Sequence, residues 1–190
     1  MKGQKKINGI LYKFNLELIN PRVKESLKYA IDYFKGKEIV ACEVGVYLGE
    51  FSTQINKRLN VKKFYLVDPY ISYDEYELVD SNGPMKWKEN AHRLNKKGNE
   101  IWIEKTSDEA IGDIPDKIDY CYIDGNHAYK YVLNDLNAYW KLINEGGILA
   151  GHDINQKDVS DAVMKFVKDN DLDISFGDRR DWWIIKRKAD

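Results

Sequence analysis

Short apolar runs and amphipathic stretches alternate along most of this chain. The clearest run, Ile39–Val44, is typical of a buried strand, and shorter runs of the same kind occupy 64–67, 101–103, 120–123 and 148–150. Between them, apolar residues recur at helical spacing, which predicts helices near 23–34, 51–59, 85–96, 129–143 and 159–168. Strands that alternate with helices predict an α/β domain, a Rossmann-like parallel sheet with helices on both faces.

Cap and turn residues indicate where the helices begin and end. Asn20 and Pro21 suit the N-cap and first position of the first helix, and Gly36 suits its end. The pair Gly146-Gly147 is expected to end the helix that begins near Tyr129. We interpret the polar, aromatic stretch 70–83 as an irregular insertion.

The end of the chain reads as a hairpin. Two apolar segments, 172–176 and 182–185, flank a Gly-Asp turn, so the last strand should run antiparallel to its neighbours. We therefore expect a mostly parallel seven-stranded sheet in one domain, 37–190, preceded by a helical lead-in, 1–36.

Composition narrows the class of protein. With 190 residues and a formal charge of −1, the chain is one ordinary domain without the basic excess of a nucleic-acid or anionic-membrane binder. No apolar run reaches the roughly 18 to 20 residues that span a bilayer, and the basic start does not continue as a secretory signal. We expect a cytoplasmic protein in which Cys42 and Cys121 are buried, reduced thiols.

Polar residues follow the ends of five predicted strands, where α/β proteins bind ligands. After the first strand, Glu43 and a turn containing Gly45 and Gly49 could let a ligand approach the backbone, or could be a plain strand-to-helix turn. Asp68, after the second strand, could accept both hydroxyls of a ribose or could open an Asp-Pro turn. Ser107-Asp108, after the third, could flank a base ring or cap a helix.

The fourth and fifth strand ends carry the most informative residues. Asp124 and His127 follow the fourth strand, and His152 and Asp153 follow the fifth. A turn and a helix cap are the structural alternatives. Two carboxylates and two imidazoles at adjacent strand ends, however, favour a divalent-metal and acid–base site.

Five segments of the chain, in this order, resemble class I S-adenosylmethionine-dependent methyltransferases. They are E-V-G-V-Y-L-G-E-F-S, Y-L-V-D-P-Y, T-S-D-E-A, I-D-Y-C-Y-I-D-G-N-H-A-Y and G-G-I-L-A-G-H-D. The likeness runs from about Ile39 to Asp153. More narrowly, the chain is similar to the branch with D-G-x-H-x-Y after the fourth strand, which includes macrocin O-methyltransferase. Catechol O-methyltransferase is a more distant relative.

The resemblance implies roles for the residues around the cofactor S-adenosylmethionine. Four residues would surround its methionine part: Glu43, Gly45, Tyr47 and Gly49. Asp68 would hold the ribose hydroxyls, and Ser107 and Asp108 would flank the adenine.

The resemblance also implies a metal site and a base. Asp124, His152 and Asp153 fall where metal-dependent members place three ligands, and His127 falls where they place a general base. Relatives usually carry a carboxylate pair or Asp-Asn in place of His152-Asp153. An imidazole there favours manganese, iron or zinc over magnesium, or no metal at all. At its ordinary pKa of about 6.5, His127 would be mostly neutral at pH 7.

The implied reaction is O-methylation of a sugar or another small-molecule hydroxyl. Rival interpretations are a non-catalytic cofactor-binding domain, a relative of a metal-dependent hydroxylase of cephamycin biosynthesis, and an NAD-dependent oxidoreductase, which the missing three-glycine fingerprint disfavours. Four aromatic residues near the insertion could form a substrate wall or cover the core: Tyr70, Tyr73, Tyr76 and Trp87. The sequence leaves a monomer and a homo-oligomer both open.

Overall fold

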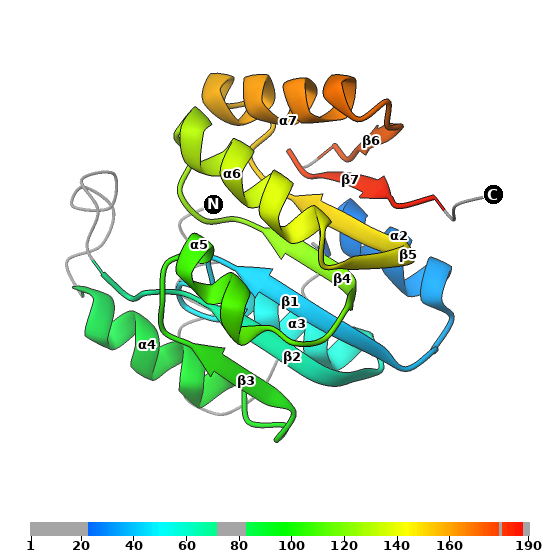
Figure 1. Cartoon of the computed structure of the whole chain (residues 1–190). Coiled ribbons are helices and arrows are strands. Elements are labelled where there is room, and N and C mark those ends of the chain that lie inside the picture. Colours follow the sequence, from blue (N-terminus) through cyan, green and yellow to red (C-terminus); the bar gives the residue numbers. More distant parts are fainter. Residues whose placement is uncertain (1–22, 72–82, 179, 188–190) are drawn as a thin grey trace.

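A twisted seven-stranded sheet organises the computed structural model, which describes residues 23–71, 83–178 and 180–187 (Figure 1). The strands are β1 (Ile39–Val44), β2 (Val61–Val67), β3 (Glu100–Ile103), β4 (Ile118–Ile123), β5 (Ile143–Gly151), β6 (Ile174–Phe176) and β7 (Trp182–Ile185). Their order across the sheet is β3-β2-β1-β4-β5-β7-β6. β7 runs antiparallel to both of its neighbours, β5 and β6, and the other pairs in the sheet are parallel. This confirms the predicted fold, including the antiparallel final strand.

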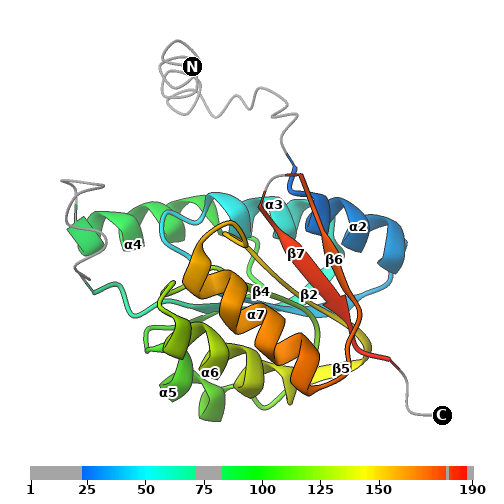
Figure 2. The same cartoon turned by 90° about the horizontal axis from the view of Figure 1, so that it is seen from above.

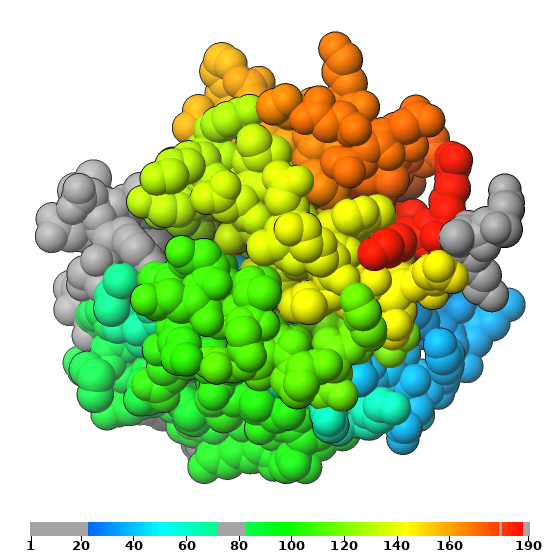
Figure 3. Space-filling model, viewed as in Figure 1, coloured from blue at the N-terminus to red at the C-terminus, as the bar shows by residue number. Residues whose placement is uncertain are grey.

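Helices cover both faces of the sheet (Figure 2). One face carries α2 (Glu25–Phe34), α3 (Glu50–Arg58) and α4 (Gly83–Leu94). The other carries α5 (Ser107–Ala110), α6 (Tyr129–Trp140) and α7 (Lys157–Asp169), with a 3-10 turn at Ile111–Asp113 after α5. In Figure 3 the side chains of this second layer, green to orange, close over the sheet.

Alternation along the buried strands divides the core into two layers. Within β1, Val40, Cys42 and Val44 pack under α5, α6 and α7. Ile39 and Ala41 face α2, α3 and α4 instead. Since side chains alternate between the faces of a strand, Glu43 points to the α2–α3 side. This placement puts a carboxyl group into an apolar layer just before the strand ends.

The two cysteines lie opposite one another in neighbouring strands. Cys42 of β1 and Cys121 of β4 are register partners, both are fully buried, and both are free thiols. Burial raises the pKa of the Cys121 thiol well above its usual value, and Cys42 beside it adds to that effect. The structure confirms that both thiols are buried and free, and it adds that they are neighbours.

Several element boundaries differ from the sequence-based prediction, and those of α2, α6 and β5 differ for clear reasons. The first described helix, α2, begins at Glu25 after an extended Lys24, whereas Asn20 and Pro21 lie outside the described residues. Helix α6 ends at Trp140, so the prediction that Gly146-Gly147 ends it was wrong. Those glycines lie within β5, which starts at Ile143, because residues 141–142 already turn the chain back into the sheet.

Of the four aromatic residues near the insertion, two lie among the described residues. Tyr70 and Trp87 are buried in the core layer that contains α4, which fits the core-covering alternative. Tyr73, Tyr76 and most of the insertion lie outside the described residues. Among the helices that the structure describes, none is long and apolar enough to cross a membrane.

Candidate functional site

The turn after β1 is pressed against the end of β4. Gly45 has a left-handed φ of +87°, and its N–H donates to Val67 O at 2.9 Å. The N–H of Asp124 donates to Val44 O at 2.8 Å. A Cβ atom on Gly45 would lie 2.2 Å from the carbonyl oxygen of Asp124, so only glycine fits. This turn therefore fixes the position of the Asp124 backbone.

Asp68, at the end of β2, organises two strained residues. Its Oδ2 accepts the N–H of Tyr47, and its Oδ1 accepts the N–H of Tyr70, each at 2.8 Å. Tyr47 and Tyr70 have φ values of +50° and +47°, which non-glycine residues rarely adopt. Burial raises the pKa of Asp68, and the backbone N–H groups partly oppose that shift. Asp68 thus has a visible structural role, and each oxygen keeps capacity for a further donor.

Glu43 is the buried acid of the site. It is 2% exposed, and burial raises its pKa to about 8, although a hydrogen bond with Ser52 lowers it. Glu43 is therefore mostly protonated at neutral pH. Its Oε2 has no hydrogen-bond partner among the described residues. A buried polar atom without a hydrogen-bond partner is energetically costly, so Glu43 Oε2 is suited to pair with a polar group of a bound ligand.

Packing accounts for Gly49 in this structure, and a hydrogen bond accounts for Ser107. A Cβ on Gly49 would meet Ala91 Cα of α4 at 2.8 Å. Ser107 donates from Oγ to the buried Asp135 Oδ1 at 2.5 Å. The helix cap is Thr106 rather than Ser107, and Asp108 is exposed.

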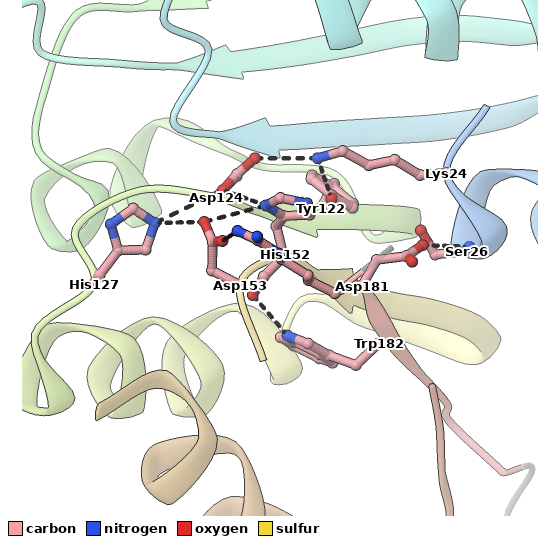
Figure 4. Close-up of polar contacts among 10 residues, drawn as sticks. Lys24, Ser26, Tyr122, Asp124, His127, His152, Asp153, Asp181 and Trp182 are labelled. Carbon is pink, nitrogen blue, oxygen red and sulfur yellow. Dashed lines mark hydrogen bonds and ion pairs between the residues drawn. The ribbon is translucent and has the colours of Figure 1, made fainter. Parts of the chain in front are cut away.

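Four side chains converge where β4 and β5 end (Figure 4). His127 Nε2 lies 3.2 Å from Asp153 Oδ2 and 3.9 Å from Asp124 Oδ1. His152 Nδ1 lies 3.1 Å from the same Asp153 oxygen and 3.9 Å from the same Asp124 oxygen. The structure thus brings together all four residues that the sequence singled out at these two strand ends.

Local structure holds each of these residues in place. Asn126 Oδ1 accepts the N–H of Ala128 at 2.9 Å, a side-chain turn that presents His127 before α6 begins. The N–H of His152 donates to Ile123 O at 3.2 Å, and Trp182 Nε1 donates to His152 O at 3.3 Å. Asp153 has a left-handed φ of +53°. Such strain in a non-glycine residue is frequent at functional sites.

Electrostatics correct one prediction. Hydrogen bonding to Asp124 and Asp153 raises the pKa of His127 to about 10, against a smaller opposing effect of burial. His127 is therefore protonated at pH 7 in this arrangement, and the expectation of a mostly neutral imidazole was wrong. The same contacts with His127 and His152 hold the pKa of Asp153 far below its usual value. The distance between imidazole and carboxylate sets this pKa shift, and it cannot be inferred from the sequence.

The donor set fits a divalent cation. One ligand atom each from Asp124, His152 and Asp153 lies within 4.8 Å of the other two. Ligands about 2.1 Å from a common ion lie roughly 3 to 4 Å apart, which matches the separations of 3.1 and 3.9 Å at His152. The two oxygens and one imidazole nitrogen suit manganese, iron or zinc.

Residues 42–154 match the sequence model of a family described as a methyltransferase domain, and this range is more than half of the chain. The chain belongs to this methyltransferase family. An uncharacterized relative, protein R132 of Acanthamoeba polyphaga mimivirus, is 29% identical over 150 residues, which are 76% of this chain and 64% of R132. The chain therefore spans less than two thirds of that relative's length.

Solved structures share the fold of this methyltransferase domain at low identity. The O-methyltransferase NovP is 11% identical with a TM-score of 0.64, over 86% of this chain and 79% of NovP. The Streptococcus mutans protein SMU.1697c, solved in complex with SAH, is 19% identical with a TM-score of 0.61, over 87% of this chain and 99% of that protein.

One residue at the site lies before the matched methyltransferase range. Lys24, just ahead of α2, places Nζ 3.2 Å from Asp124 Oδ2 and 2.5 Å from Tyr122 Oη. Sequence reasoning missed it, because a single lysine before a helix carries no signal that distinguishes it from the other lysines. Only the fold brings residues 24 and 124 together.

Proposed function

We propose that this chain is an S-adenosylmethionine-dependent methyltransferase that methylates a hydroxyl group of a sugar or another small molecule. The observation that carries the proposal is the cluster of Asp124, His127, His152 and Asp153 beside the glycine turn of a methyltransferase domain. NovP is an O-methyltransferase, which supports the acceptor class, and SMU.1697c was solved with SAH, which supports the cofactor class.

The cofactor would lie across the ends of β1, β2 and β3. The open Oε2 of Glu43 and the backbone of Gly45 and Tyr47 would face its methionine part. Asp68 would accept ribose hydroxyls with the lone pairs that Tyr47 and Tyr70 leave available. Gly49 would act through the shape of the turn, and Ser107 and Asp108 would border the adenine. When bound, S-adenosylmethionine supplies an electrophilic methyl group for displacement by an oxygen nucleophile.

The acceptor hydroxyl would be activated at the ends of β4 and β5. Asp124, His152 and Asp153 would hold a divalent cation, which supplies charge stabilisation for a developing alkoxide. His127 would take the proton of the hydroxyl at Nε2. It can do so only when Asp124 and Asp153 are neutralised by another cation, because those carboxylates keep the imidazole protonated.

Calorimetry with S-adenosylmethionine and SAH tests the cofactor part of this proposal. We expect the wild type to bind both, and Asp68→Asn to bind them roughly 5- to 150-fold more weakly through lost charge-assisted bonds to ribose. Asp161→Asn, which changes an exposed acid on α7, is the matched control and should bind as the wild type does. Binding of NAD without binding of S-adenosylmethionine would overturn the assignment. Once an acceptor is found, its product should gain the mass of one methyl group.

A further inference from the structure

Lys24 reaches the candidate metal site from a different part of the fold. Its Nζ contacts Asp124 Oδ2 and Tyr122 Oη and lies 4.3 and 4.4 Å from the ring centroids of Phe51 and Tyr122. Its side chain is only 18% exposed. Figure 4 shows Asp124 between this ammonium group and the two histidines. An aromatic pair and a carboxylate together form a favourable environment for a cation.

The backbone next to Lys24 is anchored as well. The N–H of Ser26, in the first turn of α2, donates to Asp181 Oδ2 at 2.6 Å, and Asp181 is fully buried. An acid that accepts a first-turn N–H caps the helix, here from a residue 155 positions away in the sequence. The start of α2, and with it Lys24, is therefore fixed relative to β7 and to the site.

The two oxygens of Asp124 face different side chains. Oδ2 faces Lys24 at 3.2 Å, whereas Oδ1 faces His127 and His152 at 3.9 Å each. A divalent cation held by Asp124 would share this one carboxylate with the ammonium group of Lys24. Like charges on one carboxylate repel, and the low exposure of Lys24 limits screening by water.

We propose that Lys24 is a resident cation of this site that competes for Asp124 and sets how tightly the site takes a divalent metal. This inference rests on the metal site of the proposed function. By linkage, an ion bound at Asp124 weakens the Lys24–Asp124 contact, which is one of two contacts that hold the start of α2, the other being the Ser26 N–H bond to Asp181. Lys24 thereby couples occupancy of the site to a helix that lies outside the matched methyltransferase range.

Lys24 also has an effect that would increase the affinity of the site for a metal. A partner that orients a metal ligand typically increases affinity by 10- to 100-fold, so loss of Lys24 could also weaken binding. Asp124, however, is held from other directions by its N–H bond to Val44 O and by the two histidines. Orientation therefore survives without Lys24, and relief of the charge repulsion dominates.

Titration of the full chain with Mn²⁺ alone, followed by calorimetry and by the spin resonance of free Mn²⁺, tests the proposal. Lys24→Met should bind Mn²⁺ about 10-fold more tightly than the wild type, or more. Lys24→Arg keeps the charge and should stay near the wild type. Lys28→Met removes a lysine that pairs with Glu25 one turn further along α2 and should change nothing. Asp153→Asn should lose binding, which identifies the site.

Hydrogen exchange of the wild type gives a second measurement that needs no Lys24 variant to fold. Adding Mn²⁺ should speed exchange of the amides in the first turns of α2. Equal or weaker binding by Lys24→Met, or unchanged exchange, overturns the role of Lys24 and leaves the metal site intact. If neither the wild type nor Lys24→Met binds Mn²⁺, the metal part of the proposed function and this inference both fail.

Discussion

The ends of β1 and β2 and the ends of β4 and β5 both carry acids, but these acids have different partners. Asp68, after β2, accepts two backbone N–H groups of the chain itself. Asp124 and Asp153, after β4 and β5, face imidazole and ammonium groups instead. A carboxylate that accepts backbone N–H groups orders a loop even without a ligand. Carboxylates that face cationic side chains can exchange those partners for another cation.

Charge state separates the two regions further. Glu43, the other acid of the first region, stays mostly protonated at neutral pH because burial raises its pKa to about 8. Asp153 in the second region stays ionised, because the histidines hold its pKa far below the usual value. The first region thus offers shape, hydrogen bonds and a neutral acid, and the second offers charge. The proposed function requires such a division, with a cofactor-binding region beside a region that activates an acceptor.

The largest effect should come from breaking the contact between the two regions. Gly45→Ala places a methyl group against the carbonyl oxygen of Asp124 and requires an unfavourable positive φ. We expect the free energy of unfolding to fall by about 3 kcal/mol or more, measured by urea denaturation.

Gly112→Ala is the control for that change. Gly112 has open space around it and no positive φ, so alanine should shift the free energy of unfolding by about 0.5 kcal/mol at most. If the two variants were equally stable, the close approach of the β1 turn to Asp124 would be wrong.

A second effect should isolate the neutral acid of the first region. Because the pKa of Glu43 is raised to about 8, the native state binds a proton more tightly than the unfolded chain does. Raising the pH from about 4.5 to 8 therefore destabilises the wild type by up to about 1.4 kcal/mol per pH unit. When the pH rises from 6 to 9, we expect the free energy of unfolding of the wild type to fall by about 1 to 3 kcal/mol more than that of Glu43→Gln.

Denaturation curves at both pH values measure this difference, and Glu89→Gln provides the comparison. Glu89 is exposed on α4, so its variant should lose as much stability as the wild type. A Glu43→Gln variant with the pH dependence of the wild type would show that Glu43 is ionised when folded.

The strands, the antiparallel direction of the last one and the positions of the polar clusters were accessible from the sequence because apolar periodicity and chain alternation encode them. Gly146-Gly147 misled the prediction, since glycines that look like a helix end can also lie inside a strand that starts earlier. The four residues Asp124, His127, His152 and Asp153 were found because parallel strands end at one edge of the sheet.

Properties that depend on distance were not accessible. The raised pKa of His127 follows from its closeness to the carboxylates of Asp124 and Asp153, which no spacing in the sequence reports. Lys24 reaches Asp124 across 100 positions of the chain. Long-range contacts of single polar residues leave no periodic pattern, so only the folded structure shows them.

The smallest effects should separate Ser107 from its neighbour Asp108 at the end of β3. Ser107 donates to Asp135, whose carboxyl is buried and has a pKa raised to about 6 by that burial, so Ser107→Ala should cost about 1 kcal/mol of stability. Asp108 is exposed, and Asp108→Asn should leave the unfolding curve unchanged while weakening S-adenosylmethionine binding several-fold. Thermal unfolding and calorimetry on the same two variants measure both effects. If Ser107→Ala weakens cofactor binding and Asp108→Asn does not, then Ser107 alone borders the adenine. The exposed carboxylate of Asp108 would then have no part in binding the cofactor.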